Sequence, residues 1–328
     1  MKLRNFFRAL VAAAVACTAQ NAARAQDAWP SKPVKVIVPS SPGGGTDAYA
    51  RIIAQALSES TRQQFIIDNR PGASGGIGAQ AVAKAAPDGY TILLSANAAI
   101  AINPALYKNL PFDADKDFAP VTRGVMAPMV IAAFPGNSAG AGYKTLADLV
   151  NAGKLEPNTI AYGSAGSGSP PYLGVRMLEE AAGAKFVHVP YKGVGPAYVD
   201  LIAGRIKFIF TDLATVQQQI AAGKVAALAV NQRTTLLPGV PSIAEAGWPK
   251  VEIFTSFSVL APAGTPADIV QKLNAQIVAA MKTPAVADKL NAQALVPVFD
   301  TPEQFAASLK AERAQWNAFV QRNNITPE

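Results

Sequence analysis

The segment VIVPSSPGGGTDAYARIIAQAL, residues 36–57, places hydroxyl groups and glycines between an apolar stretch and an amphipathic helix. Hydroxyls donate hydrogen bonds, glycines let backbone amides approach a ligand closely, and the start of a helix adds partial positive charge. Thr46 and Asp47 are suited to cap this helix. The pattern predicts a site for a small anion. Its candidate residues are Ser40, Ser41, Gly45, Thr46 and Asp47.

A second segment, GSAGSGSPPYLG at residues 163–174, repeats the pattern, with Ser164, Ser167 and Ser169 as donors. Pro170 suits the first turn of the following helix. Neither loop contains Lys or Arg. Several uncharged hydrogen bonds would hold a carboxylate reversibly, which suits capture and release. Either loop alone is also an ordinary strand-to-helix turn, but two in matching places favour binding.

Groups for catalysis are scarce, because His188 is the one histidine and Cys17 the one cysteine. A His/Cys metal site is therefore excluded. The alternative is a secreted serine hydrolase with Ser74, in GASGG, as nucleophile and His188 as base. The nucleophile elbow needs a strand that runs directly into the turn, whereas Asn69-Arg70-Pro71 intervenes here. Otherwise His188 is a polar residue that ends a strand.

Other enzyme signatures are incomplete. GASGGIG resembles the glycine turn of short-chain dehydrogenases, but none of the eight tyrosines has a lysine four residues later. The Gly-Lys-Ser/Thr of a P-loop does not occur in the sequence. No nucleotide cofactor is predicted.

The elements that must position the two loops alternate between strand and helix. Apolar strands are predicted at residues 34–38, 65–67 and 91–94, separated by stretches with helical periodicity. The alternation restarts after Ala133, with a strand at residues 159–162. This order predicts an α/β protein with parallel sheets covered on both sides. Two similar halves suggest two lobes facing each other across a cleft, with crossings at Met129–Ala133 and Phe254–Ser258.

The N-terminus has the pattern of a secretory signal peptide: basic residues, an apolar run from Ala9 to Ala19, and Ala23-Arg24-Ala25. Cleavage is predicted after Ala25. Cys17 would permit a lipid anchor, but Ala14-Val15-Ala16 matches a lipobox poorly. Removing residues 1–25 lowers the net charge from +7 to +3, since four basic residues and no acidic ones leave. The remaining charge gives little support for nucleic-acid or membrane binding, and export points to the periplasm.

Several ordered motifs resemble the Bug proteins, the periplasmic receptors of tripartite tricarboxylate transporters. The motifs are WPSKPVKVIVPSSPGGGTDAYAR (29–51), NRPGASGGIGAQAVAKAAPDGYTILL (69–94), INPALYKNLPFDADKDFAPVT (102–122), YGSAGSGS (162–169), HVPYKGVGPAYVDLIAGRI (188–206), LPGVPSIAEAG (237–247) and VLAPAGTP (259–266). Together they run in order along nearly all of the chain after residue 28.

The resemblance implies a two-lobed, type II periplasmic-binding-protein fold that closes on a small carboxylate. Carried over by position, the contacts of the first lobe are Thr46 and Asp47, flanked by Ser95, Ala96 and Asn97. Those of the second lobe are Ser164, Ser167, Gly168 and Ser169. Asp212, in FTDLA, is expected either to accept a hydrogen bond from an amine, a hydroxyl or a bridging water, or to cap a helix.

The sequence departs from the family pattern at two positions. Ser40 replaces an aromatic residue, and Tyr172 follows Pro171 where the family commonly has Thr-x-x-His-Leu. We hypothesise that Ser40 and Tyr172 influence which acid fits and that Phe257 adds an apolar wall. The alternative is that Tyr172 packs on its own helix and Phe257 in the core.

The resulting expectation is a receptor that is not an enzyme and needs no metal or cofactor. We expect lobe 1 to comprise residues 26–131 and 254–328, and lobe 2 residues 132–253. The partners would be a small carboxylate and the membrane permease, without nucleic acid, and the protein would be a monomer. A sensor that docks on a signalling receptor remains an alternative, and the sequence leaves the identity of the acid open.

Overall fold

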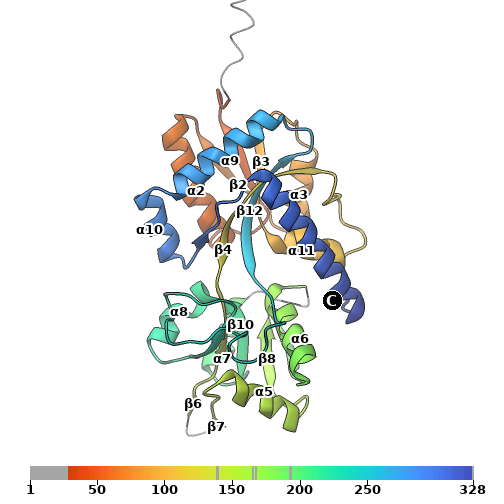
Figure 1. The fold of residues 1–328 in the computed structure, drawn as a ribbon, viewed down its shortest axis with the longest axis vertical. Helices are drawn as coiled ribbons and strands as arrows, with labels where there is room; N and C mark the ends of the chain where they lie inside the picture. Colours follow the sequence, from red (N-terminus) through yellow and green to blue (C-terminus); the bar gives the residue numbers. More distant parts are fainter. Residues whose placement is uncertain (1–28, 138–139, 165, 167, 192–193, 327–328) are drawn as a thin grey trace, which may run out of the picture.

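The computed structural model describes residues 29–137, 140–164, 166, 168–191 and 194–326. The expected signal peptide and Cys17 lie outside these residues. The described chain forms two lobes, each built on its own sheet, stacked along the long axis of the molecule (Figure 1).

The upper lobe in Figure 1 contains a six-stranded sheet in the order β13-β4-β12-β3-β1-β2. Its strands are β1 (Val34–Val38), β2 (Phe65–Asn69), β3 (Thr91–Ala96), β4 (Phe118–Ala127), β12 (Thr255–Pro262) and β13 (Val296–Pro297). β1 is parallel to β2 and β3, while β12 is antiparallel to β3 and β4. Because helices cover both faces, β12 is buried along its entire length.

The helices of this lobe come from both ends of the chain. They are α2 (Gly45–Thr61), the short 3-10 helix η1 (Ala73–Gly75), α3 (Gly76–Ala83), η2 (Ala98–Ile102), α4 (Asn103–Leu106), α9 (Ala267–Met281), α10 (Pro284–Ala292) and α11 (Pro302–Arg322). α2 packs against α9 and α10, and α11 packs across β4. The C-terminal segment therefore completes the lobe that the N-terminal segment begins.

The lower lobe contains a five-stranded sheet in the order β11-β5-β10-β8-β9. Its strands are β5 (Met129–Ala133), β8 (Ala161–Ser164), β9 (Val187–Pro190), β10 (Phe208–Asp212) and β11 (Ala226–Val230), and a separate ribbon pairs β6 (Gly136–Asn137) with β7 (Gly140–Ala141). Its helices are α5 (Leu146–Leu155), α6 (Pro170–Ala182), α7 (Val194–Ile202) and α8 (Leu213–Ala221). β8 is parallel to β9 and β10, so the ends of these strands meet at one edge.

The chain passes between the lobes twice. β4 ends at Ala127 in the upper sheet and β5 begins at Met129 in the lower sheet, with Pro128 between them. The chain returns before β12, which begins at Thr255. The segments expected as crossings, Met129–Ala133 and Phe254–Ser258, are thus β5 and the start of β12, and the passage comes at their N-terminal ends.

One local prediction was wrong. α2 begins at Gly45 with Gly44 as its N-cap, and no side chain caps it. Thr46 and Asp47 lie inside the first turn, where the acidic Asp47 still suits the positive end of the helix. Gly44 has the extended backbone of an N-cap residue, with φ −86° and ψ 172°, so the helix starts before Thr46 and Asp47. Among the described residues, no helix combines the length and apolar character needed to cross a bilayer.

Candidate functional site

The first-lobe loop between β1 and α2 is held in shape by Asp47. The Gly43 backbone amide and Arg51 Nε donate to Asp47 Oδ2 at 3.0 and 2.9 Å. Asn69 Nδ2 donates both to Asp47 Oδ1 at 3.0 Å and to the Ser40 carbonyl at 3.1 Å. Burial alone would raise the pKa of Asp47, but these hydrogen bonds outweigh it and hold the pKa below its ordinary value. Asp47 therefore braces the loop as a carboxylate.

The tip of this loop is packed against the second crossing. A Cβ on Gly45 would lie 2.9 Å from Cζ of Phe257, so only glycine fits without displacement of the ring. Thr46 is buried, while Ser41 and Gly45 are exposed and Ser40 is half-buried. The Ser40 hydroxyl is shielded and has no hydrogen-bond partner in the protein. The loop thus presents its backbone and small side chains.

The residues after β3 connect the sheet to the second crossing. Asn97 Nδ2 donates to the Phe254 carbonyl at 3.1 Å and to Glu312 Oε1 at 2.8 Å. Asn97 Oδ1 accepts from the Ser256 amide at 3.2 Å. Ser95 is completely buried and donates to the Ala96 carbonyl. In this structure Asn97 and Ser95 make internal contacts beside the hinge.

The second-lobe loop between β8 and α6 is organised by two serines. Ser169 is the N-cap of α6: its hydroxyl accepts from the Tyr172 amide and donates to the Gly166 carbonyl at 2.7 Å. Ser164 Oγ accepts from the Gly166 amide at 3.1 Å and lies 2.7 Å from His188 Nε2. Ser167 lies outside the described residues.

His188 belongs to the base of this loop. Its ring lies between Tyr162 and Tyr172, with centroid distances of 5.2 and 4.6 Å. Ser74, its partner in the hydrolase alternative, is in η1 of the other lobe, whereas His188 is in β9. The hydrolase arrangement is not favoured, because the imidazole is engaged with Ser164 instead.

The second-lobe loop reaches the first lobe at Gly168. A Cβ there would lie 3.0 Å from Leu106 Cδ1 and 3.6 Å from Tyr107 Oη, at the end of α4. The two expected binding loops therefore lie on the sides of the lobes that face each other.

A cavity of about 240 Å³ lies between the lobes, next to the first-lobe loop. Its walls come from the loop before α2, the start of α8, the end of β4, β12 and the segment after α10. The lining residues are Gly43, Gly44, Gly45, Ala48, Ala127, Asp212, Ala214, Thr215, Phe257, Gln293 and Leu295. Thus Gly45, Asp212 and Phe257 come together from three distant parts of the sequence.

Asp212 contributes to this cavity a carboxylate oxygen that has no hydrogen-bond partner in the protein. It occupies the N-cap position of α8, yet its side chain caps no amide of that helix. Oδ1 is shielded from solvent and has no hydrogen-bond partner in the protein. Burial raises the pKa of Asp212 to about 6, and a hydrogen bond with Thr255 opposes part of that rise. The geometry leaves an acceptor in the wall of the cavity.

The two aromatic candidates differ in position. Phe257 lines the cavity and lies 6.3 Å from the buried Tyr49 ring, so it is both a wall and part of the core. Tyr172 is half-buried, packs against the core and His188, and does not line the cavity.

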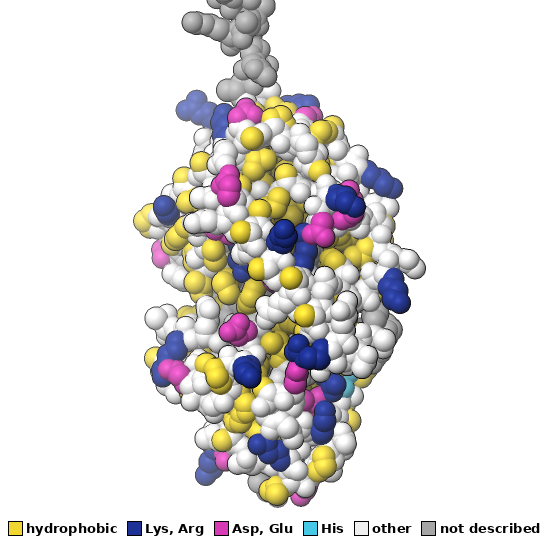
Figure 2. Space-filling view, turned by 45° about the vertical axis from the view of Figure 1, so that its right-hand side comes forward, with side chains coloured by type: hydrophobic (Ala, Val, Ile, Leu, Met, Phe, Trp, Pro, Cys, Tyr) yellow, Lys and Arg dark blue, Asp and Glu magenta, His cyan; other side chains and the backbone are white. Residues whose placement is uncertain are grey.

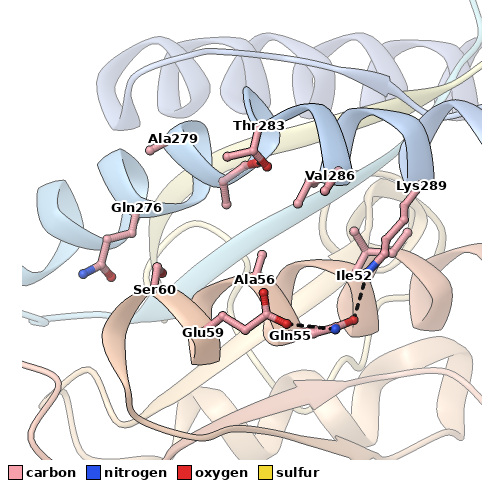
Figure 3. A pocket seen from close by; sticks show the side chains of 12 residues that line it. Ile52, Gln55, Ala56, Glu59, Ser60, Gln276, Ala279, Thr283, Val286 and Lys289 are labelled. Carbon is pink, nitrogen blue, oxygen red and sulfur yellow. Dashed lines mark hydrogen bonds between the residues drawn. The ribbon is translucent and has the colours of Figure 1, made fainter.

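Two other hollows are lined by other residues, the second of which includes Leu106 and Tyr107, the neighbours of Gly168. A groove of about 480 Å³ runs between α2, α9 and α10, with Ala56, Ala279 and Val286 in its walls and Lys289 bound to Gln55 at one end (Figure 3). A shallow hollow of about 860 Å³ lies between α4 and the end of α11. Neither contains a residue of the two glycine and serine loops.

The cation beside the first loop is paired. Arg51, next to the first loop, is neutralised by Asp47 at 2.9 Å. On the face shown in Figure 2, basic and acidic side chains alternate over both lobes without a large patch of one sign. Among the described residues, no group of three or more His, Cys, Asp or Glu is arranged to hold a metal ion. Hydrogen-bond donors and helix termini are able to hold an anion without a metal ion.

Sequence reasoning missed several residues that shape the site. Asn69 links Ser40 to Asp47, and Thr215, Gln293 and Leu295 line the cavity. Gln293 follows α10, far from either loop in the sequence, and no local pattern points to it.

Comparisons with known proteins agree with this architecture. The family model described as "Tripartite tricarboxylate transporter family receptor" matches residues 49–325. Protein BugT of Bordetella pertussis is 35% identical over 90% of this chain and 90% of its own. The structure of R. palustris Rpa4515 with adipate has a TM-score of 0.81 and 33% identity, covering 92% of this chain and 100% of that chain. MatC (Rpa3494) from Rhodopseudomonas palustris with bound malate has a TM-score of 0.76 and 29% identity, covering 89% and 100%.

These matches extend along almost the entire chain and include both lobes. They confirm the resemblance to the Bug proteins and the two-lobed α/β fold of periplasmic binding proteins. The chain belongs to the tripartite tricarboxylate transporter receptor family.

Proposed function

We propose that this protein is a periplasmic receptor that captures a small carboxylate between its lobes and releases it unchanged to a membrane permease. The observation that carries the proposal is the interlobe cavity, where the start of α2, the start of α8 and the unpartnered Asp212 oxygen meet. Its volume of about 240 Å³ suits a small metabolite. The relatives of known structure that hold adipate and malate support an acid as the ligand.

In this proposal the backbone amides of Gly44 and Gly45 donate hydrogen bonds to one carboxylate of the ligand, while the Gly43 amide stays bonded to Asp47. Helix termini stabilise negative charge, and glycines allow the close approach. Asp212 accepts a hydrogen bond from a hydroxyl, an amine, a water or a protonated carboxyl group of the ligand. Phe257 forms the apolar wall, and Ser40 limits the entrance.

The second lobe supplies the opposing contacts. We assign this role to Ser164, Gly168 and Ser169, together with Ser167, and we place Tyr172 at the edge of the site. Thr46, Asp47, Ser95, Ala96 and Asn97 complete the first-lobe side, with Asp47 and Asn97 acting mainly by positioning the backbone. Closure around the ligand follows if the ligand binds the closed arrangement more tightly than the open one.

The proposal includes the wider role of the protein. We infer export by the segment of residues 1–25, action as a monomer, delivery to the permease subunits, and no catalytic turnover. Binding through uncharged hydrogen-bond donors allows the ligand to be released, since each neutral hydrogen bond contributes only about 0.5–1.5 kcal/mol to binding.

A thermal-shift screen of residues 26–328 tests the function. Succinate, malate, adipate and citrate should be compared with the matching neutral amides at constant ionic strength. A specific ligand at 100 times its dissociation constant stabilises the folded protein by about 2.7 kcal/mol. A raised melting temperature with an acid and none with its amide is expected. Equal shifts with acids and amides, or none with any acid, would contradict the proposal.

A further inference from the structure

The end of the C-terminal helix makes a polar contact with the opposite lobe. Arg322 Nε donates to Glu180 Oε1 at 2.8 Å and Arg322 Nη2 donates to Oε2 at 3.3 Å. Asn323 Nδ2 donates to Glu180 Oε2 at 3.2 Å. Glu180 is in α6 of the lower lobe, while α11 belongs to the upper lobe, and Figure 1 shows the two helices close together. Among the ion pairs of the described residues, this one joins the two lobes.

Each side of this contact is fixed to its own lobe. On α11, Leu309 and Trp316 are buried, and Glu312 Oε2 accepts from Arg123 Nη2 of β4 at 3.2 Å. On α6, Leu178 is buried and Glu179 Oε1 accepts from the Phe186 amide at 2.7 Å. Whether the contact forms therefore depends on the position of one lobe relative to the other.

The position of Glu180 is unfavourable for its own helix. It lies in the last turn of α6, where the carbonyl ends already carry partial negative charge. Arg322 lies in the last turn of α11, where a cation is favoured. Hydrogen bonds from Arg322 hold the pKa of Glu180 below its ordinary value, so the carboxylate is charged at neutral pH. The carboxylate gains its stabilisation from the opposite lobe.

Helix α6 connects this contact to the binding loop. Its N-cap is Ser169, in the second-lobe loop, and Glu180 lies near its other end. The peptide crossings between the lobes lie at Pro128 and before Thr255, and relative motion is the usual expectation for domains linked in this way. A rotation that carries the loop away from the first lobe would also carry Glu180 away from Arg322.

We propose that Glu180, Arg322 and Asn323 form a latch that stabilises the closed arrangement of the lobes and thereby sets ligand affinity without touching the ligand. They are positioning residues, and the inference rests on the proposed function. Apparent affinity scales with the fraction of protein in the binding-competent state. Exposed ion pairs contribute modestly, so neutralising the latch should weaken binding about two- to five-fold.

The test compares Glu180→Gln with Arg233→Gln by stopped-flow and calorimetric titration of an acid found in the thermal-shift screen. Arg233 pairs with Glu245 within the lower lobe at 2.9 Å and is as exposed as Arg322, which makes it a matched control. Glu180→Gln should raise the dissociation constant two- to five-fold, mainly through faster release, and Arg233→Gln should leave it unchanged. The difference should shrink at 1 M salt, where screening acts over about 3 Å.

Charge reversal provides a stronger test. Glu180→Arg should weaken binding further than Glu180→Gln, and the double variant Glu180→Arg/Arg322→Glu should recover part of the loss. Small-angle scattering of the ligand-free proteins should show a larger radius of gyration for Glu180→Arg than for wild type. If the radius of gyration and the dissociation constants of all Glu180 variants equal those of wild type, the proposal that these residues form a latch is wrong. If no acid binds wild type, the proposed function fails, while the scattering comparison still tests the latch.

Discussion

At the scale of single residues, two aspartates near the interlobe cavity have opposite roles. Asp47 has three donors around its carboxylate and a pKa below its ordinary value. Asp212 has an oxygen without a partner and a pKa raised by burial. A satisfied carboxylate holds structure, whereas an unsatisfied one is costly until something binds it. This contrast makes Asp212, rather than Asp47, the group we expect to respond to ligand.

The raised pKa of Asp212 should be visible in the pH dependence of the free energy of unfolding. Because the pKa of Asp212 rises from 3.8 to about 6 on folding, the folded protein binds this proton more tightly than the unfolded chain. The resulting stabilisation is present below about pH 4 and is lost as the pH rises to about 6. Relative to Asp212→Asn, ligand-free wild type should lose about 2–3 kcal/mol between pH 4 and 7. Urea unfolding of both proteins across this range measures it, and parallel curves would contradict the assignment.

Gly45 should tolerate no side chain, because its Cβ would meet the Phe257 ring at 2.9 Å. Gly45→Ala is expected to destabilise the protein by about 1–3 kcal/mol and to weaken ligand binding. Gly239→Ala, outside both binding loops, is the control, since nothing lies within 4 Å of its Cβ position. Chemical denaturation and titration calorimetry of both variants provide the measurement. Equal effects of the two substitutions would show that the contact with Phe257 is unimportant.

At the scale of elements, local sequence patterns predicted where the strands and the two loops lie. They did not predict the contacts that these elements make with distant parts of the chain. The stretches at 34–38 and 91–94 were predicted as strands because most of their residues are apolar, as is common in buried parallel strands. The N-cap of α2 was mispredicted because a glycine occupies the capping position without a side-chain bond. Asn69, Gln293 and Glu180 carry no local signal, since their partners lie far away in the sequence. The hydrogen bonds of Asn69, the cavity wall at Gln293 and the contact of Glu180 between the lobes could therefore be identified only from the structure.

Ser169 should matter for binding beyond its role as a helix cap. Ser169→Ala removes the acceptor for the Tyr172 amide and the donor to the Gly166 carbonyl, at a cost of about 1 kcal/mol. Thr145→Ala removes the cap of α5 in the same lobe and should cost a similar amount. We expect ligand affinity to fall only for Ser169→Ala and to return in Ser169→Thr. Loss of affinity in both alanine variants would mean that lobe stability alone controls binding.

At the scale of the whole molecule, binding depends on how the two lobes are held. Two crossings form the hinge, and Asn97 ties the second one to both β3 and α11 through Phe254, Ser256 and Glu312. The same helix reaches the opposite lobe at its end. Hinge, C-terminal helix and binding loop are thus connected through rigid elements, so a change in lobe position is transmitted to the cavity.

Gly168 offers a direct way to prop the lobes apart. Its Cβ position lies 3.0 Å from Leu106 of the first lobe, so Gly168→Val should act as a wedge between the second-lobe loop and α4. Because the side chain strains the closed arrangement and leaves the open one unaffected, ligand affinity should fall at least ten-fold, a closed-state cost of about 1.4 kcal/mol. Gly195→Val, on α7 with nothing within 4 Å of its Cβ, is the control and should bind the ligand as tightly as wild type. Small-angle scattering with saturating ligand should show contraction in wild type and Gly195→Val and a larger radius of gyration in Gly168→Val. Normal contraction of the Gly168→Val protein would mean that the loop and α4 do not approach each other when the ligand is captured.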